Sequence, residues 1–240
     1  MAPADPTFAD VRAAGERIRG LVHRTPVVTC RTLDRLTGCS VHLKCENLQK
    51  VGAFKARGAC NGVFALSEED AGRGVATHSS GNHAQALAWA AGLRGIRAIV
   101  VMPADAPPVK VAAVQGYGGR IVWAGSGPRD RERTLERVLA ETGAVFVHPS
   151  NDFHVIAGQG TAVLELLADA PGLDVVVAPV GGGGLLSGTA LAVAARSPGT
   201  RVVGAEPEKV DDAARSFRDG RIHPPTGAFT VADGLRTCRG

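Results

Sequence analysis

Aromatic side chains are scarce in this chain, at 4% of 240 residues, and their scarcity limits the functions open to it. Proteins that bind single-stranded nucleic acid stack the bases on clustered rings, and this sequence has too few rings for such a platform. The net charge is only +4 at pH 7, and the densest basic stretch, residues 129–137, interleaves arginines with acidic residues. This pattern is typical of a solvated helix face. We therefore expect no nucleic-acid partner.

Cysteines and long apolar runs are also few. The cysteines stand at positions 30, 39, 45, 60 and 238, without any Cys-x-x-Cys pair, which argues against a disulfide framework or a zinc site and favours a reducing, cytoplasmic compartment. The first six residues lack the pattern of a signal peptide. The uncharged run 175–195 is interrupted by Pro179 and residues 181–184, so it predicts a strand, a glycine loop and a helix rather than a membrane span. We expect no membrane partner.

Glycine is abundant, with 31 residues that cluster in turns. Short β-rich runs alternate with amphipathic helical patterns along the whole chain, which predicts an α/β fold with parallel sheets. The predicted strands cover residues 41–45, 74–78, 96–102, 120–123, 145–148, 174–178 and 202–205. Ligands bind such sheets beyond the carboxyl ends of the strands, so the turns that follow strands are the candidate sites.

One candidate functional residue is Lys55, which follows the glycine-containing turn Val51-Gly52-Ala53-Phe54 at the start of a predicted helix. Most lysines are solvated surface charges, and Lys55 taken alone would be explained in this way. A lysine amine at the mouth of a helix can also form a Schiff base with a carbonyl, and pyridoxal phosphate is a common partner. The choice between the two interpretations depends on the loops elsewhere in the chain.

Three turns after strands have suggestive sequences. Residues 79–83, Ser-Ser-Gly-Asn-His, offer polar groups at a helix N-terminus, where they either hold a carboxylate or phenolate oxygen or cap the helix. Residues 181–184 are consecutive glycines before a predicted helix. Their spacing matches neither a dinucleotide fingerprint nor a Walker motif, and it favours a phosphate site for a small cofactor over a flexible turn. Residues 206–212 contain carboxylates that either bind a hard cation or remain solvated.

These motifs, in this order and at this spacing, resemble the fold-type II pyridoxal-phosphate enzymes, specifically the serine racemase and serine/threonine dehydratase (threonine ammonia-lyase) family. Further landmarks of the resemblance, which spans nearly the whole chain, are His23-Arg24-Thr25-Pro26, His148-Pro149, residues 156–161 and Ala232-Asp233-Gly234. The family fold, similar to that of the tryptophan synthase β subunit, implies two three-layer α/β/α domains with mostly parallel sheets. Residues 1–74 and 148–240 would form the two parts of the large domain, and residues 75–147 the small domain.

The resemblance also implies a role for each motif residue. Lys55 would form the Schiff base and act as the base on one face of the substrate α-carbon, and Ser80 would serve the opposite face in a racemase. Phe54 would pack near the cofactor ring, and Asn82 would donate to its phenolic oxygen. The cofactor phosphate would be held by Gly181, Gly182, Gly183, Gly184 and Leu185, and the substrate carboxylate by Ser79, Ser80, Gly81, Asn82 and His83.

The implied reaction is β-elimination from a hydroxyamino acid, L-serine or L-threonine, to a 2-oxo acid and ammonia, together with racemisation of serine. Glu206, Asp212 and the carbonyl of Val210 match a magnesium or calcium site of the family. Some racemases of the family bind ATP at the positions that correspond to Gln85, Lys110 and Tyr117. The implied assembly is a homodimer.

Two features depart from the family pattern. Val51 stands where many relatives have threonine, which leaves 3-hydroxyaspartate open as a substrate beside serine and threonine. The sequence ends soon after Ala232-Asp233-Gly234, whereas relatives continue with further strands and helices, so we expect a C-terminally incomplete large domain. The alternatives to an active lyase are a cofactor-binding remnant without catalysis and, on the glycine loop alone, a nucleotide-binding module.

Overall fold

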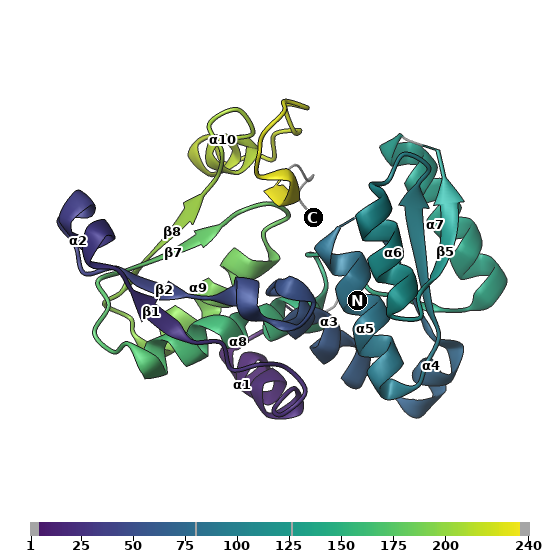
Figure 1. The fold of residues 1–240 in the computed structure, drawn as a ribbon, viewed down its shortest axis with the longest axis horizontal. Helices are drawn as coiled ribbons and strands as arrows, with labels where there is room; N and C mark the ends of the chain where they lie inside the picture. Colours follow the sequence, from purple (N-terminus) through teal and green to yellow (C-terminus); the bar gives the residue numbers. More distant parts are fainter. Residues whose placement is uncertain (1–4, 80, 126, 236–240) are drawn as a thin grey trace.

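The computed structural model describes residues 5–79, 81–125 and 127–235, and helices alternate with strands along the chain (Figure 1). The strands are β1 (Val27–Thr29), β2 (His42–Lys44), β3 (Val75–His78), β4 (Ala98–Pro103), β5 (Arg120–Ala124), β6 (Val145–Phe146), β7 (Val175–Pro179) and β8 (Arg201–Ala205). The helices are α1 (Phe8–Arg17), α2 (Arg31–Thr37), α3 (Lys55–Phe64), α4 (Glu68–Arg73), α5 (Asn82–Arg94), α6 (Pro108–Gly116), α7 (Pro128–Thr142), α8 (Phe153–Asp169), α9 (Gly184–Arg196) and α10 (Asp212–Asp219). Short 3₁₀ turns cover Glu46–Leu48, Lys50–Gly52 and Asp233–Leu235.

The strands between residues 75 and 146 form one parallel sheet in the order β5-β4-β3-β6. Helices α5 and α6 cover one face and α7 covers the other, so β4 is buried along its whole length. Alternate side chains of β4 point to opposite faces of the sheet and enter two different core clusters. Val100 and Met102 pack with α5, whereas Ile99 and Val101 pack with α7. This part of the chain is a three-layer α/β/α unit, in agreement with the predicted fold class.

The remaining strands form two separate pairs, which lie with α1, α8 and α9 in the other half of the molecule (Figure 1). β7 and β8 are parallel, and β1 and β2 are antiparallel. Val176 belongs to a core cluster with residues of α1, α8 and α9, whereas Val175 and Val177 on the opposite face of β7 are exposed. Within the described residues, helices therefore cover one face of the β7–β8 pair.

Glycines allow α3 and α9 to pack very closely against α8. A Cβ atom on Gly158 of α8 would lie 2.7 Å from the Cα of Gly58 in α3. Two residues further along α8, toward its opposite face, a Cβ on Gly188 of α9 would lie 2.6 Å from the nitrogen of Gly160. Side chains larger than hydrogen would separate these backbones, so the three helices form one rigid unit. This packing holds the start of α3 and the start of α9 in a fixed relation.

Candidate functional site

Lys55 is the first residue of α3, and its amine meets a segment that lies far away in the sequence. Nζ donates a hydrogen bond of 2.5 Å to the carbonyl oxygen of Pro149 and lies 5.3 Å from the centre of the Phe54 ring. Burial lowers the pKa of Lys55 to about 8. An amine with such a pKa can be both nucleophile and proton carrier near neutral pH, which Schiff-base chemistry requires.

The glycine loop reaches the same place through Ser150. Gly183 caps the N-terminus of α9 with a φ of +88°, a conformation that favours glycine. A Cβ on Gly184 would lie 2.7 Å from the Ser150 carbonyl oxygen, so a larger residue could not enter this contact. Gly181 and Gly182 lead into this turn from β7, and Leu185 follows it in the first turn of α9.

The juxtaposition of Lys55 and the glycine loop fits a cofactor with an aldehyde and a phosphate. Pro149 and Ser150 are neighbours in sequence, and one contacts the Lys55 amine while the other contacts Gly184. The free N–H groups at the start of α9 can therefore bind a phosphate close to the amine. Pyridoxal phosphate has both groups, and the residues present fit it.

The polar loop between β3 and α5 lies beside the segment that carries Pro149. His83 is buried, and its Nε2 lies 3.2 Å from the carbonyl oxygen of Val147. Burial lowers the pKa of His83 to about 3, with a further contribution from the charge of Lys55, so the ring is neutral.

Three other residues of this loop, Ser79, Gly81 and Asn82, are described by the structure. Asn82 is the first residue of α5 and is exposed, and Gly81 donates its N–H to Ser79 Oγ at 3.2 Å. Ser80, the predicted acid–base residue on the second face, lies outside the described residues. The structure thus joins Lys55, Gly184 and His83 to one segment, residues 147–150, while the roles of individual residues stay predictions.

The predicted metal residues lie in a different turn, between β8 and α10. The Glu206 carboxylate accepts hydrogen bonds from the N–H groups of Ala213 at 3.0 Å and Ala214 at 2.7 Å, so it caps α10. Asp212 and Val210 are both buried. Over residues 5–79, 81–125 and 127–235, no cluster of three His, Cys, Asp or Glu side chains is suited to a metal, and the predicted set itself contains only two carboxylates. The metal site stays a prediction.

The residues predicted to bind a nucleotide lie in the half of the molecule that contains the four-stranded sheet. Gln85 is on α5, Lys110 is on α6 and Tyr117 ends α6. The two helices pack against each other, which keeps these positions in one region. Nothing beyond this common location bears on ATP, so its site also stays a prediction.

A buried charge cluster directly behind Lys55 was missed by the sequence analysis. The side chain of Arg57 is fully buried and donates to Glu46 at 2.8 Å and to Glu165 at 2.8 and 2.9 Å. Lys44 adds a bond of 2.7 Å to Glu165. Burial alone would lower the pKa of Arg57, but the two carboxylates raise it, so the guanidinium stays charged. The available sequence signal was a second cation on α3, two residues after Lys55, followed by a stretch without charge.

A ring cluster at the ends of β3 and β6 was also missed. The ring of His78 stacks on Phe146 with centroids 5.6 Å apart, and His148 meets both rings edge-on at 5.9 and 5.6 Å. In the sequence, His148 stands out only as a family landmark beside Pro149. The cluster borders the segment that accepts the Lys55 hydrogen bond.

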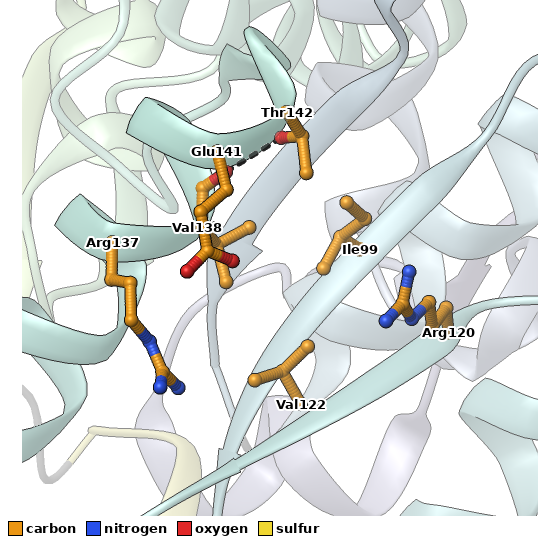
Figure 2. A pocket seen from close by; sticks show the side chains of 7 residues that line it. All are labelled: Ile99, Arg120, Val122, Arg137, Val138, Glu141 and Thr142. Atoms are coloured by element: carbon orange, nitrogen blue, oxygen red, sulfur yellow. Dashed lines mark hydrogen bonds between the residues drawn. The ribbon is translucent and has the colours of Figure 1, made fainter.

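Figure 2 shows a cavity on the α7 side of the four-stranded sheet. Its volume is about 220 Å³, and Ile99 and Val122 form part of its apolar wall. Arg120, Arg137 and Glu141 stand at its edges. None of the sequence-predicted site residues lines it, so this cavity forms no part of the candidate site.

Comparison with known proteins agrees with this geometry. The sequence model of the family described as pyridoxal-phosphate dependent enzyme matches residues 18–238. A β-hydroxyaspartate dehydratase from Paracoccus denitrificans is 54% identical over 230 residues, covering 96% of this chain and 73% of that protein. A serine racemase from Oryza sativa subsp. indica is 48% identical, covering 96% of this chain and 68% of the relative.

Solved structures show the same similarity in three dimensions. The structure of maize serine racemase matches with a TM-score of 0.97 at 47% identity, covering 99% of this chain and 72% of that one. The threonine deaminase from T.th. matches with a TM-score of 0.90 at 48% identity, covering 97% of this chain and 76% of the other. The order of motifs, the placement of Lys55 and these similarities lead to one conclusion: the chain belongs to the pyridoxal-phosphate-dependent enzyme family and has its fold type II.

Proposed function

We propose that this chain is a pyridoxal-phosphate-dependent lyase that removes water and then ammonia from a hydroxyamino acid to give a 2-oxo acid, with racemisation of serine as a second outcome. The observation that carries the proposal is the position of the Lys55 amine, 2.5 Å from the carbonyl oxygen of Pro149. The next residue, Ser150, contacts Gly184 of the glycine loop. Similarity to a dehydratase and to serine racemases supports the choice of reaction.

When bound, pyridoxal phosphate supplies an electron-withdrawing ring that stabilises negative charge on the substrate α-carbon. Lys55 would hold the cofactor through its amine, and the free amine would accept the substrate α-proton at Nζ. A pKa of about 8 lets a substantial part of Lys55 be neutral near physiological pH, as a base must be. Phe54 borders the amine and limits the access of water from that side.

The remaining residues of the proposal bind and orient. The N–H groups at the start of α9, from Gly183 onward, hold the phosphate by hydrogen bonds and the helix dipole. The 79–83 loop at the start of α5 binds the substrate carboxylate in the same way, and Asn82 donates to the phenolic oxygen of the cofactor. Ser80 returns a proton to the face opposite Lys55, which gives the other enantiomer instead of elimination.

The substrate is L-serine or L-threonine in the first form of the proposal and 3-hydroxyaspartate in the second. The second form is supported by the relative at 54% identity that is named a β-hydroxyaspartate dehydratase. The segment Gln-Lys-Val-Gly-Ala-Phe-Lys, which contains Val51, resembles that of some racemases and hydroxyaspartate dehydratases, so it leaves serine, threonine and 3-hydroxyaspartate all open. A substrate with two carboxylates would need a second anion site. The preference between 3-hydroxyaspartate and the other two substrates can be measured by comparing their turnover.

The proposal extends to the partners and location of the protein. No helix of the described residues is long and apolar enough to cross a membrane. Four described cysteines, Cys30, Cys39, Cys45 and Cys60, are free thiols, which supports a reducing cytoplasmic location.

We further propose that the protein is a homodimer. In each protomer, residues 1–74 and 148–240 would form the large domain and residues 75–147 the small domain. Regulatory ligands would be Mg²⁺ or Ca²⁺ at Glu206, Val210 and Asp212, and ATP near Gln85, Lys110 and Tyr117.

The test combines spectroscopy with turnover. Wild-type protein loaded with pyridoxal phosphate should absorb in the visible range, and borohydride reduction should fix the cofactor mass on the Lys55 peptide. Lys55→Ala should lose both signals, whereas Lys50→Ala, in the nearby 3₁₀ turn, should keep them. An unchanged spectrum in Lys55→Ala would refute the proposal.

Turnover separates the lyase from a non-catalytic remnant. L-Serine, L-threonine and 3-hydroxyaspartate are supplied in parallel with Mg²⁺, and the 2-oxo acid is measured for each. A lyase should form product from at least one of them and lose that activity in Lys55→Ala. A Lys55-linked cofactor with no product from any substrate would instead support the remnant.

A further inference from the structure

We infer that His148 is a positioning residue: its ring fixes the peptide unit between Pro149 and Ser150, and the carbonyl of that unit holds the Lys55 amine. The inference deepens the proposed function and rests on it, because it concerns the same site. His148 is a landmark of the sequence that the proposed chemistry does not use.

The hydrogen bonds of His148 close a tight turn. Its Nδ1 accepts from the N–H of Ser150 at 3.1 Å and from the N–H of Asn151 at 2.8 Å. The N–H of Ser150 and the C=O of Pro149 belong to one planar trans peptide unit, so they point in opposite directions. Because His148 holds the N–H end, the carbonyl end is aimed at Nζ of Lys55, 2.5 Å away.

The ring of His148 is itself held in place and in the required protonation state. Phe146 and His78 contact it edge-on at 5.6 and 5.9 Å, which restricts its rotation. An Nδ1 that accepts two N–H groups carries no proton, so the proton sits on Nε2. Burial, together with His78 and Lys55, lowers the pKa of His148 to about 4, so the ring is neutral, as an accepting Nδ1 requires.

The same turn sets the distance from the amine to the glycine loop. The carbonyl of Ser150 lies against Gly184, where even a methyl group would come within 2.7 Å of it. A rotation of the 149–150 and 150–151 peptide units, whose N–H groups both bond to His148, would therefore displace the Lys55 contact and the start of α9 relative to each other. One cofactor must meet both, and an error near 1 Å in such a site can cost roughly a hundredfold in rate.

Two substitutions separate positioning from simple packing. His148→Asn puts an amide oxygen close to the place of Nδ1 and keeps the acceptor, whereas His148→Leu keeps similar bulk without an acceptor. In His148→Leu, we expect the amides of Ser150 and Asn151 to exchange with solvent about five- to tenfold faster in the apoprotein, the loss expected for one hydrogen bond. We expect His148→Asn to exchange at the wild-type rate.

The holoenzyme gives the functional measurement. His148→Leu should shift the pH midpoint of the Lys55-linked visible absorbance and lower kcat by about tenfold with little change in KM, because orientation rather than substrate binding is lost. His148→Asn should restore the midpoint and most of kcat. His154→Leu, a matched change on the first turn of α8, should alter neither measurement.

Each outcome decides the inference. The inference would be overturned if the amides of Ser150 and Asn151 exchanged at the wild-type rate in His148→Leu and the pH midpoint of the absorbance did not change. It would also be overturned if His148→Leu and His148→Asn lost the same share of kcat, because the imidazole itself would then be required. If His148→Leu does not fold, His148→Asn alone decides, since the inference demands wild-type behaviour from it. Failure of the proposed function looks different: Lys55→Ala would keep the absorbance, while amide exchange would still report on the turn.

Discussion

The turn around Lys55 and the turn after β8 were both expected to bind ligands, yet they are held by different kinds of contact. The Lys55 amine bonds to a carbonyl 94 positions away in the sequence. The Glu206 carboxylate bonds to N–H groups seven and eight positions away, at the start of the next helix. The first contact exists only when distant segments have packed, whereas local folding alone explains the second. A polar group with no local role is therefore the better evidence for a ligand site.

The largest expected effect concerns the charge cluster behind Lys55. Arg57→Leu would leave Glu46 and Glu165 partly buried without their main partner, so the free energy of unfolding should fall by about 3–5 kcal/mol. Urea denaturation of the apoprotein measures it. Arg24→Ala, which removes an exposed ion pair with Asp169, should cost less than about 1 kcal/mol. Equal losses of unfolding free energy in the two variants would show that the buried ion pairs of Arg57 stabilise the fold no more than an exposed surface pair does.

The second effect concerns the contact between the glycine loop and Ser150. Gly184→Ala forces a methyl group against the Ser150 carbonyl and should cost about 1–3 kcal/mol, and it should also weaken the affinity for pyridoxal phosphate. Gly116→Ala, at the end of α6 where a Cβ meets open space, should change stability by less than about 1 kcal/mol. Thermal melting and a cofactor titration measure both quantities. A Gly184→Ala protein with wild-type affinity would separate the loop from the cofactor.

The fold class and the order of the site motifs could be predicted because their signals are local. Strand β4 is a continuous apolar run, and the glycine loop stands out in any short window. The missed elements had weaker local signals: α2 has no buried residue, and β1 has only three residues. Helix α4 could have been found, because Ser67 caps it by accepting from the N–H of Asp70.

The contacts that complete the site could not be predicted, for a physical reason. Every residue has a backbone carbonyl, so nothing in the sequence singles out that of Pro149 as the partner of Lys55. The predicted strand 145–148 ends early, at Phe146, because His148 turns its ring onto the following backbone. Such contacts depend on the packing of α3 against α8, which involves residues about a hundred positions apart. Only the tertiary structure contains that information.

The third prediction uses the pKa of Lys55 in the apoprotein, which burial lowers from 10.5 to about 8. Below pH 8 the amine is charged in both the folded and the unfolded state, and the folded state bears the cost of burying it. Above pH 10.5 the amine is neutral in both states and the cost disappears. The stability of wild type relative to Lys55→Met should therefore rise between pH 8 and 10.5, by up to about 3 kcal/mol.

Urea denaturation of the two apoproteins across this pH range measures the difference. The matched pair of wild type and Lys209→Met, at an exposed lysine, should show no such trend. A flat difference for Lys55 as well would mean that water reaches the amine freely, and the contrast between the two turns would lose its main support.

The smallest expected effect is at Glu206, and it tests the other side of the contrast. Glu206→Gln leaves one good acceptor for two N–H groups of α10, so the loss should be about 1 kcal/mol, typical of a weakened helix cap. If capping is the whole role of Glu206, Mg²⁺ or a chelator should leave the melting temperatures of wild type and Glu206→Gln unchanged. If Mg²⁺ raises the melting temperature of wild type but not of the variant, the carboxylate also binds the cation. In that case Asp212→Asn should abolish the response too, because a cation held by Glu206 and the Val210 carbonyl would need the second carboxylate to balance its charge.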